Sequence, residues 1–295
     1  MAKITIIGLG RVGTALGILL SRAGHQIVSA FDIDPDARVK FAKDLNTNVA
    51  GRLDEAVLGP DVILISVPDR AIEDVSHAIS CSQDLRQGVY IGHTSGALSS
   101  RSLHHVKAEG CPTFSMHPIQ TFASVESAVK AMPQSYFGIE GDPEALRLAE
   151  EIVTSIGGKP LLINPDLKPL YHTALCVASN FLVTLLDMAV KLCEDAKIEK
   201  EKALNIMLPL IKTTMSNFEQ SGTRALTGPI ERGDADTVKG QLKVVETLEP
   251  KMIPVYLALA KATVSIAQEM GSITVDEAKL FLQTLESVDK QTLEE

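Results

Sequence analysis

Short runs of apolar, mostly β-branched residues alternate with longer amphipathic stretches over the first 160 or so positions. A continuously apolar run bounded by turn residues is typical of a buried strand, and a 3.6-residue period is typical of a helix. The pattern predicts strands at 3–7, 26–31, 61–67, 89–91, 113–116, 136–139 and 160–163, with a short further strand at 48–51. Helices are predicted at 12–23, 36–44, 70–80 and 144–156. This alternation predicts βαβ units and a doubly wound, mostly parallel sheet of the α/β class.

The pattern changes near Asn164-Pro165-Asp166. Beyond this point no segment reads convincingly as a strand, and long stretches follow a helical period. These stretches predict helices at 170–197, 200–221, 235–248, 252–268 and 276–285. We therefore expect two domains, an α/β domain over residues 1–165 and an all-α domain over residues 166–295.

Composition and charge narrow the classes of function. The chain has 295 residues, of which 45% are hydrophobic and 22% charged, enough for two folded domains. Its formal net charge of −9 argues against a nucleic-acid partner, because an acidic surface repels phosphate. No continuous apolar run reaches the roughly 20 residues of a membrane span, and the first residues lack the layout of a secretory signal, so no membrane partner is expected. The four cysteines are widely spaced, which predicts free thiols in a reducing cytoplasm and no metal site.

A glycine motif lies between the first predicted strand and the first predicted helix. It reads Gly8-Leu9-Gly10-Arg11-Val12-Gly13, or G-x-G-x-x-G. In a dinucleotide-binding βαβ unit the first glycine allows a tight turn, the second lets the backbone approach the pyrophosphate, and the third lets helix and strand pack closely. Asp32 stands 19 residues after Gly13, where an acid binds the adenosine ribose. The context therefore favours a dinucleotide site over a purely structural turn.

Asp32 also bears on the identity of the dinucleotide. A carboxylate at this place repels a 2′-phosphate and favours NAD over NADP. Arg38 leaves NADP open, because it would serve a 2′-phosphate if the loop turned it inward. The alternative is that Asp34 caps the following helix and that Arg38 is solvated.

Several motifs in sequence order resemble a known family. They are the glycine motif, ILISVPD at 63–69, GHTSGAL at 92–98, MHPIQTF at 116–122, YHTALCVASN at 171–180 and ALTGPIERGD at 225–234. The chain resembles the predicted oxidoreductases built from a Rossmann-like domain and a C-terminal helical domain of unknown function. That family is related to pyrroline-5-carboxylate reductase, prephenate dehydrogenase and the β-hydroxyacid dehydrogenases, and its helical domain is like that of 6-phosphogluconate dehydrogenase. The resemblance implies a nicotinamide covered by the helical domain, a homodimer, and substrates that are mostly undefined, with ketopantoate linked to one branch.

Three further motifs stand at predicted strand ends, where ligands bind in a doubly wound sheet. Val67 and Pro68 are expected beside the cofactor, or else as a plain strand terminator. Thr94 and Ser95 are candidates for the nicotinamide end of the cofactor and for the substrate, with helix capping as the alternative. His117 resembles the substrate-contacting histidine of prephenate dehydrogenase, and imidazole is suited to proton transfer. His104 and His105 have no such placement and are expected at the surface.

The first long helix of the back half carries His172, Cys176 and Asn180 at four-residue spacing. Residues eight apart rise about 12 Å along a helix, so His172 and Asn180 would flank a substrate rather than grip one atom. The β-hydroxyacid dehydrogenases carry a Lys-x-x-x-Asn pair in the corresponding helix. Here the position four before Asn180 is Cys176, so the family's catalytic lysine is absent, and Lys168 is the nearest substitute in sequence.

The segment LTGPIERGD at 226–234 interrupts the helical half. Arg232 would bind a substrate carboxylate in bidentate fashion, and Thr227 would add a hydroxyl. The alternative is a capped turn in which Asp234 begins the next helix and Arg232 makes a surface pair.

The sequence as a whole predicts a cytoplasmic NAD(P)-dependent oxidoreductase, with NAD as the expected cofactor. Its substrate is expected to be a small carboxylate with a carbonyl, hydroxyl or imine carbon, for example a 2-keto acid such as ketopantoate. His117, His172 and Asn180 are the catalytic candidates, and Ser95, Thr227 and Arg232 are the substrate-binding candidates. The alternative from another class is a non-catalytic dinucleotide-binding regulator or redox sensor, since the glycine motif fits both.

Overall fold

The computed structural model describes residues 1–292, with side chains described through residue 286. Contacts within the chain group Met1–Asn180 and Phe181–Glu295 into two compact units, and each is described by itself. The last strand ends at Leu162, but the helix that follows belongs to the first unit.

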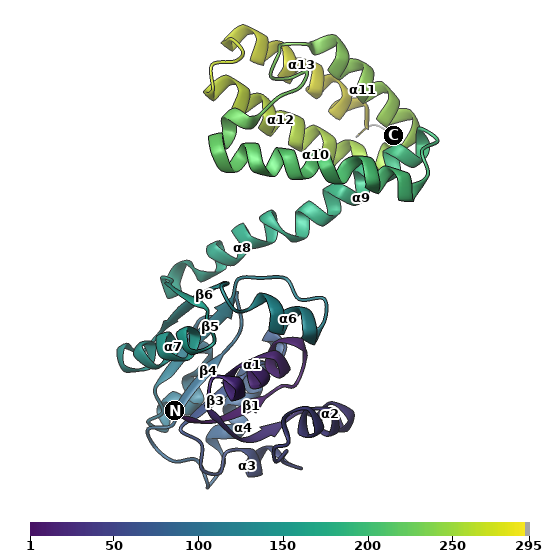
Figure 1. Ribbon diagram of the computed structural model, residues 1–295. Helices are drawn as coiled ribbons and strands as arrows, with labels where there is room; N and C mark the ends of the chain where they lie inside the picture. The colour runs from purple at the N-terminus through teal and green to yellow at the C-terminus, as the bar shows by residue number, and fades with distance from the viewer. Residues whose placement is uncertain (293–295) are drawn as a thin grey trace. The chain divides into compact units, whose positions relative to one another are not determined.

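The first unit is built on one sheet (Figure 1). Among the described residues its strands are β1 (Lys3–Ile7), β2 (Gln26–Phe31), β3 (Val62–Ile65), β4 (Tyr90–His93), β5 (Thr113–Pro118), β6 (Tyr136–Gly141) and β7 (Lys159–Leu162). Their order is β2-β1-β3-β4-β5-β6-β7, and only the β5–β6 pair is antiparallel. The α/β class and the mostly parallel sheet are thus confirmed. The short strand predicted at 48–51 is wrong, because this segment is a loop that makes a single sheet-like bond, from Ala50 N–H to Ala30 O at 2.8 Å.

The central strands β1, β3, β4 and β5 are buried over almost their whole length, because both faces of the sheet are covered. Successive strand residues point to opposite faces, so Ile6 and Leu64 join one core cluster while Ile63 and Ile65 join the other. The first cluster receives residues of α1, α6 and α7, and the second receives residues of α4 and α5. The carboxyl ends of β1, β3 and β4 therefore lie side by side at one edge of a rigid sheet.

The helices of this unit are α1 (Arg11–Arg22), α2 (Pro35–Leu45), α3 (Leu53–Ala56), α4 (Asp69–Ser80), α5 (His104–Ala108), α6 (Val125–Ala131), α7 (Pro143–Ser155) and α8 (Lys168–Ala178). Two 3₁₀ turns, η1 (Ser100–Leu103) and η2 (Pro165–Leu167), precede α5 and α8. The sequence pattern missed α3, η1, α5 and α6, which are too short to show a helical period. It also predicted one helix over 170–197, where the structure has α8 and α9 separated at Ser179.

The second unit is all-α. It contains α9 (Asn180–Asp195), α10 (Lys200–Ser221), α11 (Ala235–Leu248), α12 (Ile253–Glu269) and α13 (Val275–Thr292), with the 3₁₀ turns η3 (Gly222–Ala225) and η4 (Pro250–Met252). Its core is formed by α11, α12 and α13 and includes Leu242, Leu257, Val264 and Phe281. In α10, by contrast, only Ala203 is buried.

One stretch corrects the expectation about membrane spans. Pro165–Asp195 is long and apolar enough to cross a membrane by length and composition, with a mean hydropathy of 1.7, and 6% of the apolar window is buried. Scattered polar residues break its apolar runs, so no single run in the sequence reaches the length of a membrane span. Exposed apolar helices of this kind also occur where a soluble protein meets a partner.

The four cysteines are free thiols, as expected.

Candidate functional site

The glycine motif forms a turn that is packed tightly on two sides and open on the third. Gly8 has φ +92°, and a Cβ there would lie 2.5 Å from the Ser66 carbonyl oxygen. A Cβ at Gly13 would lie 1.9 Å from the Gly8 carbonyl oxygen. A Cβ at Gly10, by contrast, would meet no described heavy atom within 4 Å. Gly8 and Gly13 are therefore required by the fold, whereas the space at Gly10 is free for a ligand.

The α1 N terminus and Asp32 border this open space. Gly10 is the N-cap of α1, and the first backbone N–H groups of a helix have no partner within the helix and attract anions. Asp32 Oδ2 accepts the Leu9 N–H at 2.6 Å, and Oδ1 accepts the Asp34 N–H at 2.9 Å. These bonds fix the Asp32 carboxylate at the end of β2, next to the glycine turn. The residues present thus fit the pyrophosphate and ribose of a dinucleotide.

Arg38 does not point toward Asp32 but toward the loop that contains Gly51. Its guanidinium donates to the Gly51 carbonyl at 2.7 Å and lies 5.8 Å from the Phe31 ring centroid. Asp34 accepts the Asp36 N–H and caps α2, as the alternative interpretation expected. Arg38 is therefore held by backbone oxygen and an aromatic face.

A series of contacts leads from the glycine turn across the strand ends. Gly8 and Gly13 both abut Ser66, and the Thr94 hydroxyl donates to Ser66 Oγ at 3.2 Å. Val67 Cγ1 would lie 2.9 Å from a Cβ at Gly8, and Pro68 is the N-cap of α4. The predicted strand-end residues are therefore brought together at one edge of the sheet.

The Ser95–Leu98 turn lies next along this edge of the sheet and is supported by the buried side chain of His93. Ser95 Oγ accepts the N–H groups of Ala97 and Leu98, so this hydroxyl shapes the turn. His93 is fully buried beneath it, where Nδ1 accepts the Ser95 N–H at 3.1 Å and Nε2 lies 3.1 Å from the Ser99 carbonyl oxygen. Burial lowers the pKa of His93 to about 3, so this ring is neutral and structural.

Two histidines meet at Gly96. A Cβ at Gly96 would lie 2.7 Å from His117 Nε2 and 2.5 Å from His172 Cδ2, and the two ring centroids are 5.8 Å apart. The Tyr171 hydroxyl lies 3.0 Å from His117 Nδ1. Cys176 Sγ lies 3.8 Å from His172 Nδ1, one helical turn further along α8. The structure thus brings His117 and His172 together although they are 55 positions apart in sequence.

Burial sets the protonation states of this cluster. Desolvation, followed by the charges of His172 and Lys168, lowers the pKa of His117 to about 4. Desolvation raises the pKa of Tyr171 to about 12. At neutral pH a neutral imidazole therefore faces a protonated phenol, and neutral imidazole can donate or accept a hydrogen bond at Nε2 depending on its tautomer.

Lys168 is not available as a substitute for the family's lysine. It is fully buried, and its Nζ donates to Ser115 Oγ and to Glu140 Oε1, the latter at 3.1 Å. Glu140 also accepts the N–H and the hydroxyl of Ser100, each at 2.8 Å. Burial lowers the pKa of Lys168, and the Glu140 charge opposes that shift. This network joins the first turn of α8 to β5, β6 and η1.

The remaining sequence candidates are spread along the helices. Asn180 is exposed at the start of α9, two turns beyond His172. Thr227 and Arg232 are exposed residues of the second unit. Asp234 caps α11 by accepting the Thr237 N–H, as the capped-turn alternative expected. Of the catalytic candidates, His117 and His172 are the pair that the structure brings into ring contact.

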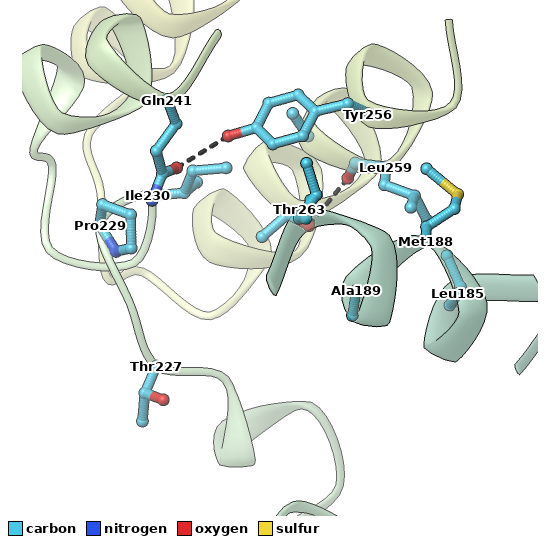
Figure 2. A pocket seen from close by; sticks show the side chains of 12 residues that line it. Leu185, Met188, Ala189, Thr227, Pro229, Ile230, Gln241, Tyr256, Leu259 and Thr263 are labelled. Carbon is cyan, nitrogen blue, oxygen red and sulfur yellow. Dashed lines mark hydrogen bonds between the residues drawn. The ribbon is translucent and has the colours of Figure 1, made fainter. Parts of the chain in front are cut away.

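Thr227 lines a pocket of about 340 Å³ in the second unit (Figure 2). The pocket is lined mainly by apolar side chains of α9 and α12, and the segment around Pro229 and Ile230 closes one side. Tyr256 reaches across it and donates to Gln241 Oε1 at 2.8 Å. The pocket therefore combines an apolar lining with one fixed polar pair.

Sequence reasoning did not single out Tyr171 or Gly138. A Cβ at Gly138 would lie 2.7 Å from the Tyr171 hydroxyl, so the absence of a side chain in β6 makes room for the phenol. The available signal was that Tyr171 directly precedes His172. The partner of Tyr171, however, is His117 on β5, and residue spacing within one segment does not indicate a contact with another segment.

Two family profiles match successive parts of the chain, and the second begins within the sheet of the first unit. The profile of a Rossmann-like domain matches residues 1–118, and that of a domain of unknown function, DUF2520, matches residues 135–263. A glycerol-3-phosphate dehydrogenase [NAD(P)+] of Fusobacterium nucleatum is 33% identical over 91 residues, which is 27% of each chain. The chain thus spans about a quarter of the length of that relative.

Two solved structures share the fold over nearly the whole chain. The Bacteroides fragilis protein BF3122 superposes with a TM-score of 0.73 at 21% identity, covering 89% of this chain and 97% of the other. A pyrroline-5-carboxylate reductase of Coxiella burnetii superposes with a TM-score of 0.57 at 13% identity, covering 99% and 98%. The resemblance expected from the motifs is confirmed: the chain joins a Rossmann-like domain to a DUF2520 domain.

Proposed function

We propose that this protein is an NAD(P)-dependent oxidoreductase acting on a small carboxylate-bearing substrate with a carbonyl, hydroxyl or imine carbon, such as a 2-keto acid like ketopantoate. The observation that carries the proposal is the continuous series of contacts from the glycine turn through Ser66 and Thr94 to the histidines at Gly96. In doubly wound sheets ligands bind at the carboxyl ends of strands, so cofactor and substrate would share this edge. The curated relatives named as NAD(P)+ dehydrogenases support the cofactor class.

NAD is the proposed cofactor. The open space at Gly10 and the α1 N terminus suit the pyrophosphate, and Asp32 suits the adenosine ribose. The Asp32 carboxylate would repel the 2′-phosphate of NADP. Arg38, the cation considered for that phosphate, is engaged with the Gly51 carbonyl. Val67, Pro68 and Thr94 complete the proposed cofactor side of the edge.

His117 is the proposed proton donor or acceptor. Bound nicotinamide supplies or accepts the hydride, and the protein must supply the proton. His117 is neutral at pH 7, its Nε2 borders Gly96, and its Nδ1 is held by Tyr171. The phenol can donate to Nδ1 or accept from it, so the pair accommodates both tautomers and both directions of reaction.

His172 and Ser95 are proposed to shape the substrate side of this edge. Asn180, Thr227 and Arg232 are proposed as further polar ligands. A guanidinium matches a carboxylate with two parallel hydrogen bonds, which suits Arg232 for an acidic substrate. We place His117 and His172 first, since their ring centroids lie 5.8 Å apart and both rings border Gly96.

A homodimer is proposed for the same protein, together with a cytoplasmic location. Exposed apolar side chains line α10, among them Leu210 at 67% and Phe218 at 57% exposure. Exposed apolar faces on the surface of a folded protein mark interaction surfaces. A second copy of the chain is the proposed cover for α10.

Cofactor binding and turnover test the proposal together. The fluorescence of NADH and of NADPH would be followed as protein is added, and 2-keto acids and cyclic imines would then be screened for oxidation of NADH. We expect NADH to bind more tightly, at least one substrate to turn over, and His117→Gln to lower kcat while NADH still binds. His25→Gln, which alters a histidine paired with Ser155, is the matched control. NADH binding without turnover of any compound would favour the regulator, and tighter NADPH binding would refute the role given to Asp32.

A further inference from the structure

A second cluster of chemically capable side chains lies on the outer face of α4 and α5. Glu73 and His77 of α4 and its C-cap residue Cys81 follow one another at four-residue spacing, so they form one stripe on the surface of this helix. His104 and His105 begin α5, which packs beside α4. The buried sides of these helices belong to the core, which fixes the two backbones relative to each other. Nothing in the proposed redox site uses these five residues.

The geometry of the cluster is compact. His104 Nε2 lies 3.7 Å from Glu73 Oε1, and the ligand atoms of Glu73, His104 and His105 all lie within 4.8 Å of one another. The His105 ring centroid is 4.1 Å from that of His104 and 4.6 Å from that of His77. Cys81 Sγ lies 3.9 Å from His77 Nε2. Three imidazoles, a carboxylate and a thiol are thus connected side chain to side chain.

These groups are the ligands that borderline divalent ions prefer. Zn²⁺ binds imidazole nitrogen and carboxylate oxygen at about 2.0–2.2 Å, usually with four ligands in a tetrahedron. Tetrahedral bonds of that length place neighbouring ligand atoms roughly 3.4 Å apart. The side chains of His104 and Glu73 are 55% and 63% exposed, so small rotations suffice to close the observed spacing around an ion. The spacing of the cysteines predicts no metal site. This cluster is formed by residues of two helices, so the spacing of one residue type along the sequence does not indicate it.

We propose that Glu73, His104 and His105 bind a divalent transition-metal ion of the Zn²⁺ class, with His77 or water as the fourth ligand. The ion would clip the start of α5 to α4. Because η1 directly precedes α5 and carries Ser100, which binds the buried Glu140, the clip would stabilise the segment that supports the redox edge. The site is structural in this proposal and takes no part in hydride transfer.

Titration of the full chain with Zn²⁺ after chelator treatment tests this site. We expect isothermal titration to give one equivalent bound with micromolar or tighter affinity, and Co²⁺ to give the visible absorption of a tetrahedral site. Thermal unfolding should shift upward when Zn²⁺ is present, since an ion that binds the folded chain stabilises it.

The variant H104Q/H105Q carries the decisive comparison. We expect it to keep its fold, because His104 is exposed and His105 is only half-buried. It should bind Zn²⁺ at least tenfold more weakly and lose the thermal shift. His25→Gln should leave affinity, Co²⁺ absorption and thermal shift unchanged. Failure of the intact chain to bind Zn²⁺ saturably, or equal affinity in H104Q/H105Q and the intact chain, would overturn the proposal.

Discussion

Gly10→Ala should separate cofactor binding from folding. Gly10 has φ −68° and ψ −165°, a conformation that alanine adopts without strain. The added Cβ would have no described heavy atom within 4 Å, so the folded chain has room for it. Alanine is a poorer N-cap than glycine but loses less chain entropy on folding, and these opposing effects keep the change in unfolding free energy within about 1 kcal/mol.

The expected loss of binding comes from one hydrogen bond to a charged group. A methyl group at Gly10 would hold the pyrophosphate away from the α1 N terminus. A hydrogen bond to a charged partner contributes about 1.5–3 kcal/mol. At 1.4 kcal/mol for each factor of ten, the Kd for NADH should rise roughly 10- to 150-fold.

The assay is NADH titration by fluorescence, with urea unfolding of the same preparations. Gly240→Ala is the matched control, because Gly240 is an exposed position inside α11 where a Cβ also meets no described atom within 4 Å. That change should raise the unfolding free energy by about 1 kcal/mol and leave the Kd unchanged. Gly13→Ala, whose Cβ would overlap the Gly8 carbonyl, should fail to fold normally. A folded Gly10→Ala variant with unchanged Kd would refute the reasoning about the glycine turn.

Further predictions concern pH, the buried ion pair and the dimer. The pKa values of His93 and His117 are lowered to about 3 and about 4, below the usual 6.5, so the unfolded chain binds more protons than the folded chain when the pH falls below 6.5. The free energy of urea unfolding should therefore be full above pH 6.5 and fall toward pH 4. The fall should be less steep in His117→Gln. Lys168→Met leaves the buried Glu140 carboxylate without its cation and should lower the free energy of urea unfolding by about 3–5 kcal/mol. An unchanged free energy of unfolding would contradict the role given to the Lys168–Glu140 ion pair. Phe218→Asp should convert a dimer to a monomer in light scattering, whereas Leu58→Asp, at an exposed apolar position of the first unit, should not.

The sequence predicted those features that depend on neighbouring residues. The strands, the glycine turn and the predominantly parallel character of the sheet follow from local periodicity and from turn chemistry. Asp32 could be placed because the βαβ unit fixes its distance from Gly13. The segment 48–51 failed because its apolar residues pack as a loop, and α5 and α6 are too short for a period to appear.

The support of the candidate site could not be predicted, since it depends on contacts between distant positions. Lys168 and Glu140 are 28 positions apart, and Tyr171 and His117 are 54 apart. A buried charge is tolerated only when it is paired, so Lys168 must find Glu140 as α8 docks on the sheet. That docking leaves Tyr171 and His172, one turn further along the helix, against His117 and Gly96. The buried Lys168 is therefore a positioning residue: it anchors the helix whose next turn carries Tyr171, the hydrogen-bond partner of the proposed proton-transfer group His117.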